Sequence, residues 1–308
     1  MKRRRLGATG LELSPVGIGT APIGSGRDWP VWWGPQDEQE SIRAIRRGLD
    51  LGVNWIDTAP FYGWGRAEET VARAVYDRRD DVLLFTKCGT IPAENGSRMD
   101  LRPAAIRADL DASLRRLRTD RVELLQLHDV DPNTPIEESW GELQQLVAEG
   151  KVLHGGISNH PAVAIERALA VGPVAALQYE YSLLHRDPEQ DILSLAGKRG
   201  IGVLAWAPLA SGFVTDTFDL AALDPDDFRR RHPFASLDLG PVRTTLRTVG
   251  ERHGRSTAQV ALAWVLRQPA VAGAIVGIRS EPEAEQLPGA ADLELSADEL
   301  REIESAVP

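Results

Sequence analysis

The hydrophobic and polar positions of this chain form two kinds of segment that alternate. Short apolar runs, which are typical of buried strands, are separated by longer segments whose apolar positions recur at helical spacing. The strand pattern is found at residues 16–19, 53–57, 82–87, 122–128, 152–159, 174–178, 201–206 and 272–277. The helical pattern is found at 38–51, 66–77, 102–117, 136–149, 161–170, 188–199, 240–253 and 256–267. Strand and helix therefore alternate along most of the chain.

This alternation predicts an α/β protein with a closed (β/α)8 TIM barrel. Parallel strands need crossover connections, which helices supply, and eight strands within 308 residues fit such a barrel. The continuous apolar character of 201–206 agrees, because barrel strands are covered on both faces. We expect a single domain over 1–308, with an N-terminal β-hairpin at 3–15 that closes the bottom of the barrel. Long βα loops follow the first and seventh strands, at 20–37 and 207–239. Loops of this length are usually functional or mobile.

Charge and composition narrow the class of protein. The chain carries 35 Lys and Arg against 45 Asp and Glu, and the net charge of −10 argues against a nucleic-acid partner, which needs a basic face. No apolar stretch approaches the roughly 20 residues of a membrane helix, and the N-terminus lacks the apolar segment of a secretory signal. The single cysteine, Cys88, excludes an intrachain disulfide and favours a reducing, cytoplasmic location. Strand alternation predicts that Cys88 is a buried thiol pointing away from the barrel centre.

Polar, ionisable or aromatic side chains lie where one expected strand after another ends. The residues are Asp57, Lys87, His128, Ser158, Asn159, Gln178, Trp206 and Gly277. Each of them alone has a structural explanation, such as a helix cap or a core histidine. Because active sites of (β/α)8 barrels form at the carboxyl ends of the strands, their joint occurrence indicates a catalytic centre.

Tyr62 adds a proton donor to this group. It follows Asp57 by five positions within a glycine-rich turn. A tyrosine is a weak acid at its ordinary pKa of about 10, but a neighbouring Lys87 would lower that pKa and Asp57 would hold the lysine charged. With His128 beside the substrate oxygen, the four residues can protonate an oxygen that becomes an alkoxide. Neither a Ser or Cys nucleophile elbow nor a metal-ligand spacing is present in the sequence.

On its motifs the chain resembles the aldo-keto reductases. The matching stretches are GIGT (17–20), NWIDTAPFYGWGRAEE (54–69), LLFTKCG (83–89), LLQLHDVD (124–131), GGISN (155–159), LQYEYSLLHR (177–186), LAWAPLASG (204–212) and VGIRS (276–280). They follow the order of the family over essentially the whole chain. Within the family the chain is most similar to the bacterial aldehyde and sugar reductase branch, which is related to inositol-operon reductases and potassium channel β-subunits.

The resemblance implies a role for each matching residue. Tyr62 would be the general acid, Lys87 would lower its pKa, Asp57 would hold the lysine, and His128 would orient the carbonyl. The cofactor-binding residues would be Thr20 and Ala21 near the first strand, Ser158, Asn159 and Gln178 at the nicotinamide carboxamide, Trp206 stacked on the nicotinamide, Leu209, Ser211 and Gly212 at the pyrophosphate, and Gly277, Arg279, Glu283 and Gln286 around the adenine ribose.

The adenine end of this set bears on the choice of cofactor. Arg279 favours NADP(H) over NAD(H), because a guanidinium suits a ribose phosphate, while the nearby Glu283 weakens that preference and leaves NAD(H) open. The chain departs from the family at Thr217, where a lysine is common, and at Gln286–Leu287, where an acidic residue and Asn are usual. Both changes predict looser cofactor binding.

Five aromatic residues of two loops are expected at the barrel mouth: Trp29, Trp32, Trp33, Phe61 and Trp64. They can form a substrate wall, or they can pack the loops onto the barrel. Such a wall suits sugars as well as aliphatic or aromatic aldehydes, so it does not identify the substrate.

The leading hypothesis is an NADPH-dependent reductase of an aldehyde or ketone. One alternative is a Schiff-base aldolase that uses the amine of Lys87 as nucleophile. Another is an NADP(H)-binding module that senses redox state and regulates a partner. The sequence leaves the physiological substrate, the direction of the reaction and the oligomeric state open.

Overall fold

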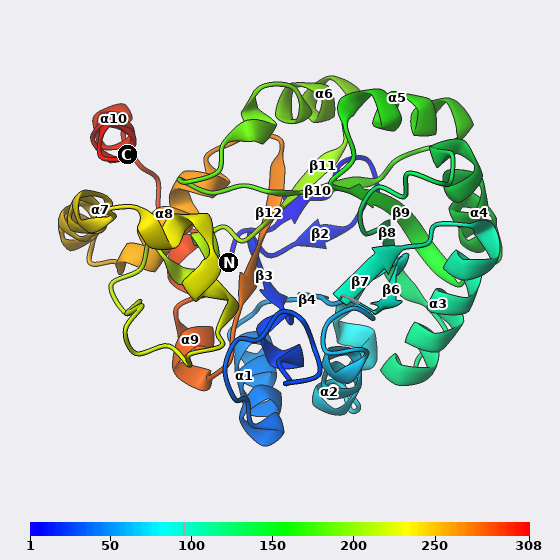
Figure 1. The fold of residues 1–308 in the computed structure, drawn as a ribbon. Helices are drawn as coiled ribbons and strands as arrows, with labels where there is room; N and C mark the ends of the chain where they lie inside the picture. The colour runs from blue at the N-terminus through cyan, green and yellow to red at the C-terminus, as the bar shows by residue number, and fades with distance from the viewer. Residues whose placement is uncertain (95) are drawn as a thin grey trace.

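The computed structural model describes residues 1–94 and 96–308, and its centre is a closed barrel of eight strands (Figure 1). Each strand pairs in parallel with its two neighbours. The strands are β3 (Val16–Gly19), β4 (Trp55–Asp57), β5 (Leu83–Cys88), β8 (Val122–Leu127), β9 (Val152–Ser158), β10 (Ala176–Glu180), β11 (Gly202–Trp206) and β12 (Val271–Gly277). The predicted (β/α)8 barrel is confirmed, with each strand in its expected place.

Helices surround the barrel (Figure 1). The predicted ones are α1 (Glu38–Asp50), α2 (Arg66–Ala74), α3 (Pro103–Leu117), α4 (Ile136–Ala148), α5 (Ala162–Val171), α6 (Ile192–Arg199), α7 (Gly240–His253) and α8 (Thr257–Leu266). Two more, α9 (Glu281–Glu285) and α10 (Ala297–Ser305), were not predicted. Short 3-10 turns lie at η1 (Pro22–Gly24), η2 (Arg79–Asp81), η3 (Asp187–Glu189), η4 (Ala210–Gly212), η5 (Phe228–Arg231), η6 (Pro233–Ser236) and η7 (Pro288–Ala290). None of the helices in the described ranges is long and apolar enough to cross a membrane.

The lower half of the barrel is filled with large side chains. Trp55, Phe85 and Leu124 are fully buried in one interior cluster. The Trp55 indole lies so close to Gly17 and Gly273 that neither position has room for a Cβ. Because this part of the barrel is packed, polar side chains that point inward are confined to the upper end, where the strands finish.

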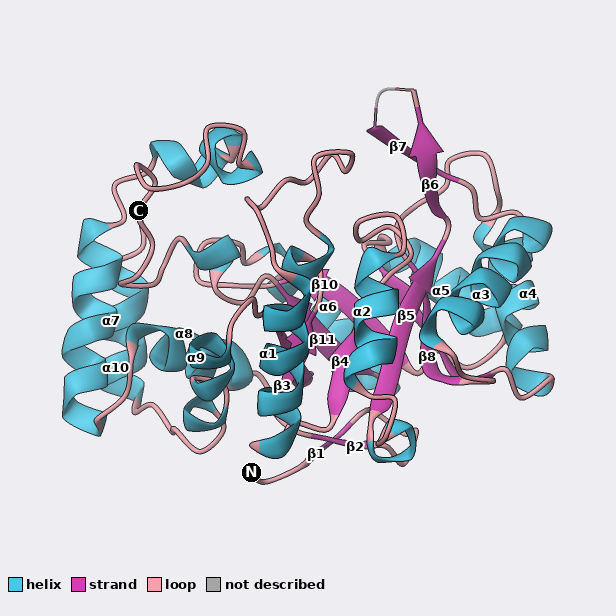
Figure 2. Ribbon diagram, turned by 90° about the horizontal axis from the view of Figure 1, so that it is seen from below, coloured by secondary structure: helices cyan, strands magenta, loops and turns pink. Residues whose placement is uncertain are grey.

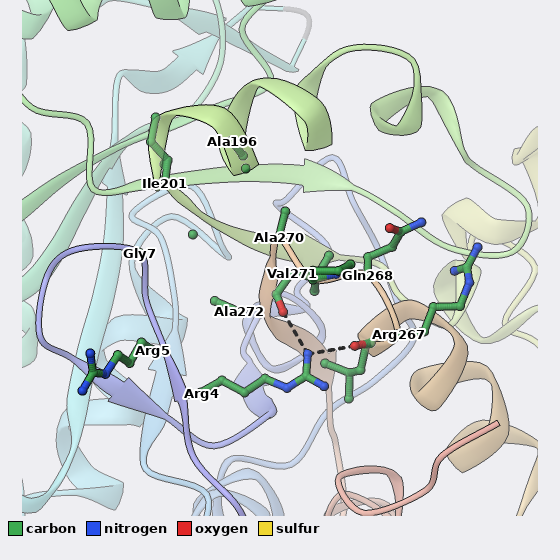
Figure 3. Close-up of a pocket in the computed structure, with 15 residues that line it drawn as sticks. Arg4, Arg5, Gly7, Ala196, Ile201, Arg267, Gln268, Ala270, Val271 and Ala272 are labelled. Carbon is green, nitrogen blue, oxygen red and sulfur yellow. Dashed lines mark hydrogen bonds between the residues drawn. The ribbon is translucent and has the colours of Figure 1, made fainter. Parts of the chain in front are cut away.

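The N-terminal hairpin closes the lower end, as expected. Strands β1 (Arg4–Arg5) and β2 (Glu12–Leu13) pair antiparallel. Leu6 and Leu13 are completely buried in the interior cluster. Beside the hairpin a cavity of about 660 Å³ is lined by Arg4 and by the segments that lead into β11 and β12 (Figure 3). The Arg4 guanidinium crosses to this side and donates hydrogen bonds to the carbonyl oxygens of Leu266, at 2.8 Å, and Val271, at 3.0 Å.

We expect Arg4→Ala to lower the free energy of unfolding by about 2 kcal/mol, because hydrogen bonds made by a charged donor contribute roughly 1.5–3 kcal/mol. Urea unfolding measures the change. Arg5→Ala is the matched control, since the Arg5 side chain is exposed on the same strand. Equal effects of the two substitutions would show that Arg4 does not tie the hairpin to the barrel.

A second hairpin was not predicted. Strands β6 (Thr90–Ala93) and β7 (Gly96–Met99) pair antiparallel directly after β5. This hairpin projects from the end of the barrel opposite to β1 and β2 (Figure 2). Cys88, the last residue of β5, is a free buried thiol in the outer core between strands and helices, as predicted. Its neighbour Lys87 points to the other side.

Candidate active site

The fold brings Asp57, Tyr62, Lys87 and His128 to one end of the barrel. Asp57 is the last residue of β4, and Lys87 is the last but one of β5. His128 follows β8, and Tyr62 lies in the connection from β4 to α2. Neighbouring parallel strands end on the same side, so side chains that are far apart in sequence meet there.

Lys87 is the centre of this group. Its Nζ atom donates hydrogen bonds to Asp57 Oδ1 at 2.5 Å, to Tyr62 Oη at 3.1 Å and to the carbonyl oxygen of Thr58 at 3.1 Å. The Lys87 side chain is 1% exposed and that of Asp57 2%. An ammonium group has three donors, and all three are used, so the lysine is held in one orientation between carboxylate and phenol.

The pKa values of Lys87 and Tyr62 differ in one respect from the expectation that Lys87 lowers the pKa of Tyr62. Burial lowers the pKa of Lys87, but the charge of Asp57 and the contact with Tyr62 together raise it above its ordinary 10.5. Burial raises the pKa of Tyr62 above its ordinary 10.0, and the Lys87 charge offsets only part of that rise. The net lowering of the Tyr62 pKa that the sequence suggested is therefore wrong in this structure. Tyr62 is a protonated phenol at neutral pH, which is the form that can give a proton away.

His128 lies beside the tyrosine as a neutral ring. The two ring centroids are 5.9 Å apart, with the planes at 85°. Burial lowers the pKa of His128 well below 6.5, and the Lys87 charge lowers it further. Its Nδ1 atom is shielded from solvent and has no hydrogen-bond partner among the described residues. A neutral imidazole has one ring N–H, which can donate a hydrogen bond to a carbonyl oxygen and so orient it. It lacks the second ring proton that an imidazolium could transfer.

Four predicted nicotinamide residues surround this group. Gln178 Nε2 donates to Asp57 Oδ2 at 2.8 Å. Asn159, with a φ of +59°, donates from Nδ2 to the carbonyl oxygen of His128 at 3.1 Å and accepts from Trp206 Nε1 at 3.2 Å. Ser158 Oγ is shielded from solvent and has no partner within the described part of the chain. All four therefore lie at the same end of the barrel as the catalytic candidates. Thr20 joins them through a 3.1 Å hydrogen bond from Oγ1 to the carbonyl oxygen of Asp57.

The connection after β11 has an unusual backbone. Ala207, Ala210 and Ser211 have φ values of +48°, +49° and +54°, and Gly212 has +94°. Non-glycine residues in this region cost about 1–3 kcal/mol each and persist mainly at functional sites. The strain falls on the segment that contains Leu209, Ser211 and Gly212, the predicted pyrophosphate residues.

At the predicted adenine end, Arg279 is turned toward the first long loop. Its guanidinium donates to Gln36 Oε1 at 2.6 Å and to the carbonyl oxygens of Trp33 at 2.8 Å and Pro35 at 2.5 Å. Three of its five N–H donors are thus used. Glu283 accepts from the Arg279 backbone N–H at 2.6 Å, so these two predicted neighbours do meet.

The remaining predicted cofactor residues lie around this end. Gly277 lies against the Pro22 ring, and Ala21 caps the η1 turn that contains Pro22. Gln286 instead accepts a hydrogen bond from the Ser256 hydroxyl at 2.9 Å, at the start of α8. Its side-chain oxygen therefore contacts the N-cap residue of α8 in this structure.

The five mouth aromatics divide into two groups. Trp29 packs edge-on against Phe61 at 5.3 Å between ring centroids, and Phe61 contacts Trp64 at 5.4 Å and His128 at 5.9 Å. These three therefore border the catalytic candidates.

Trp32 and Trp33 join the two long loops instead. Trp33 packs on Phe228 at 4.6 Å, and the backbone N–H of Phe228 donates to the Trp32 carbonyl at 3.0 Å. Arg27 lies over the Trp32 ring and pairs with Asp226. For these two tryptophans the alternative of loop packing fits the contacts, while a substrate role remains a prediction for the other three.

One polar residue of the interior, Gln126 of β8, was not among the predicted site residues. It is fully buried and donates from Nε2 to Asp57 Oδ2 at 3.3 Å. The signal was a single amide within the otherwise apolar end of the run VELLQL. Its partners, Asp57 and Gln178, lie on two other strands, so they could be identified only from the structure.

Comparison with known proteins shows the family of the chain. The model of the aldo/keto reductase family matches residues 15–308. The chain belongs to that family. It is an oxidoreductase of the group that uses NAD(P)H. An aldo-keto reductase of Bacillus subtilis is 32% identical over 311 residues, covering 98% of this chain and 92% of the relative.

Solved structures show the same family barrel. The glycerol dehydrogenase of Gluconobacter oxydans has a TM-score of 0.89 and 32% identity, over 99% of this chain and 94% of that one. An aldo-keto reductase of Bacillus halodurans in its holo form has a TM-score of 0.82 and 27% identity, over 100% and 97%. An aldo/keto reductase from Klebsiella pneumoniae in complex with NADP and acetate has a TM-score of 0.75 and 28% identity, over 100% and 97%.

Proposed function

We propose that this aldo-keto reductase uses NADPH to reduce an aldehyde or ketone to the alcohol. The observation that carries the proposal is the Lys87 ammonium bound between the Asp57 carboxylate and the Tyr62 hydroxyl, with a neutral His128 beside them. NADPH supplies the hydride when it is bound. Tyr62 gives its proton to the carbonyl oxygen, the Lys87 charge stabilises the phenolate that results, and His128 orients the oxygen toward Tyr62.

The residues of the site fit a nicotinamide cofactor. Ser158 Oγ is a buried polar atom without a hydrogen-bond partner in the described residues. Because buried polar groups are nearly always hydrogen-bonded, this atom fits a contact with a bound ligand. Ser158, Asn159 and Gln178 would hold the carboxamide, and Trp206 would stack on the ring. The strained segment from Ala207 to Gly212 would hold the pyrophosphate. The Klebsiella pneumoniae relative, whose structure contains NADP, supports this cofactor.

For the substrate we propose a small carbonyl compound, with a sugar or polyol-derived aldehyde as the first candidate. The related glycerol dehydrogenase supports a polyol-type substrate, and Trp29, Phe61 and Trp64 offer aromatic surface against which a sugar ring or carbon chain can pack. We place the chain in the aldehyde and sugar reductase branch related to inositol-operon reductases and channel β-subunits. We further propose that residues 1–308 act as one domain in the cytoplasm, as the free Cys88 thiol favours.

The two alternatives are less well supported. An aldolase needs Lys87 as a free amine, but its pKa is raised and its three donors are used. A purely regulatory module has no need of a complete proton-donating group, and the tetrad is complete in this chain.

A turnover screen tests the proposal. NADPH and NADH consumption would be followed with sugars, short hydroxyaldehydes, aryl aldehydes and diketones. We expect NADPH-dependent reduction of at least one class. Tight NADPH binding without turnover would favour the regulatory alternative, and trapping of substrate on Lys87 by borohydride would favour the aldolase.

We expect Arg279→Leu to lower the ratio of kcat/KM with NADPH to kcat/KM with NADH by about tenfold or more, since a charged hydrogen bond contributes roughly 1.5–3 kcal/mol. Steady-state kinetics with both cofactors measure the ratio. Gln36→Leu is the control, because it removes a loop contact of Arg279 and leaves the guanidinium in place. An equal loss with both cofactors would show that Arg279 serves only to fix the first loop.

A further inference from the structure

Gln126 has no part in the proton-donating group or in the predicted cofactor contacts, yet it lies directly beneath both. It belongs to β8, two residues before His128, and its side chain is fully buried inside the barrel. A buried amide needs partners for its donors and its acceptor. The barrel interior supplies them from two other strands, β4 and β10.

Three side chains close a ring of hydrogen bonds. Gln178 Nε2 donates to Asp57 Oδ2 at 2.8 Å and to Gln126 Oε1 at 3.0 Å. Gln126 Nε2 donates to the same Asp57 Oδ2 at 3.3 Å. Asp57 Oδ1, the other carboxylate oxygen, accepts from Lys87. The ring thus connects the catalytic candidates to the predicted carboxamide residue, Gln178.

The ring fixes which way the Gln178 amide faces. Both hydrogens of its Nε2 atom are used, one by Asp57 and one by Gln126. If the amide turned over, its oxygen would face the Asp57 carboxylate and the Gln126 oxygen, which are both acceptors. The nitrogen and oxygen of a glutamine are therefore assigned here by their partners. The same reasoning fixes Gln126, whose nitrogen faces the carboxylate and whose oxygen faces Gln178.

As a result the Gln178 oxygen is turned away from Asp57. None of the described residues donates a hydrogen bond to it, so it remains an acceptor for a ligand. Without Gln126, one hydrogen of Gln178 loses its partner, and a repulsion that opposes the turned-over amide is removed. Only the Asp57 carboxylate, which accepts from Gln178 Nε2 at 2.8 Å, would then oppose the turned-over amide, so the Gln178 oxygen would be held toward the ligand less firmly.

We propose that Gln126 is a positioning residue that holds the Gln178 oxygen toward the cofactor, so that the site selects a ring substituent carrying an N–H donor. This rests on the proposed function, because it takes Gln178 to contact the nicotinamide carboxamide. Gln126 itself touches no reacting atom. Its effect is on discrimination between cofactors that differ only in this substituent.

The test compares the dissociation constants of NADP⁺ and its 3-acetylpyridine analogue, which keeps the carbonyl oxygen and lacks the N–H donors. Quenching of tryptophan fluorescence reports binding without turnover. We expect the wild type to bind NADP⁺ more tightly by about fivefold to tenfold, the effect of one hydrogen bond. In Gln126→Met this preference should fall to about twofold, because Asp57 alone still orients the Gln178 amide. Gln178→Met should abolish the preference, and the double variant should behave like Gln178→Met.

Several results overturn the inference. One is a preference that Gln126→Met leaves unchanged while it weakens both ligands equally, as a packing defect would. Another is a wild type without preference. Failure of the wild type to bind either dinucleotide overturns the proposed function as well. Gln126→Leu serves as a second variant if the methionine form does not fold, and Gln145→Met, at an exposed position of α4, is the matched control.

Discussion

Tyr62→Phe is expected to lower kcat/KM for carbonyl reduction by about 10³-fold, because a positioned general acid contributes roughly 10²–10⁴-fold. The substitution removes one oxygen that accepts from Lys87 at 3.1 Å. The ring remains, and with it the aromatic contacts to Trp29, which is edge-on, and to Phe61, which is tilted. Fold and cofactor binding should therefore be preserved while proton donation is lost. Initial rates with a substrate from the turnover screen measure the effect.

Tyr76→Phe is the control, since Tyr76 is 73% exposed and lies after α2. It should leave kcat/KM unchanged. The affinity of Tyr62→Phe for NADP⁺ should stay within about twofold of the wild type. Retention of more than a tenth of the activity by Tyr62→Phe would mean that another group gives the proton, and the assignment of Tyr62 would be wrong.

The barrel strands could be predicted because each is covered on both faces. Such strands are continuous apolar runs, and 201–206 and 272–277 reappear almost unchanged as β11 and β12. The difference at β10 is informative. The apolar run ends at Gln178, but the strand continues to Glu180, because polar side chains are tolerated where the barrel opens to solvent.

Elements without an apolar run were missed. Strands β6 and β7 form an exposed hairpin, and β6 contains Pro92. Proline cannot donate a backbone hydrogen bond to a neighbouring strand, so its presence argues against a strand in the sequence. Helix α10 had a readable signal in the capping box of Ser296 and Glu299, but its apolar stripe is short. Both elements lie outside the strand–helix repeat on which the prediction depended.

For the site, the sequence indicated which residues meet and not how they are charged. Asp57, Lys87 and His128 end neighbouring strands, so their meeting follows from topology alone. The pKa of Tyr62 depends on burial, which can be judged only once the loops are in place. The rise in pKa that burial causes is larger than the lowering caused by the Lys87 charge. Arg279 and Trp33 meet across a sequence separation of 246 residues, a contact that no local pattern encodes.

Asp57→Asn is expected to lower the free energy of unfolding at neutral pH by about 3–5 kcal/mol, the usual cost of removing one partner of a buried ion pair. The Lys87 ammonium would then be buried without its carboxylate. Urea unfolding across a series of pH values measures the change. The double variant Asp57→Asn/Lys87→Met should recover most of the loss, because it removes the unpaired charge together with its partner.

The dependence on pH distinguishes this cause from a packing defect. In the wild type the pKa of Lys87 is raised above 10.5 in the folded state, so its stabilising effect is complete below pH 10.5 and is lost as the pH rises through the folded-state pKa. In Asp57→Asn, burial still lowers the pKa of Lys87, and of the two groups that raise it only Tyr62 remains. The pKa of Lys87 in the folded state should therefore fall below its value in the unfolded chain. Between these two pKa values the unfolded chain binds the extra proton, so the variant gains stability as the pH rises toward 10.5. The difference between variant and wild type should therefore shrink with rising pH and be independent of pH in the double variant. A constant difference would show that Lys87 does not carry an unpaired charge.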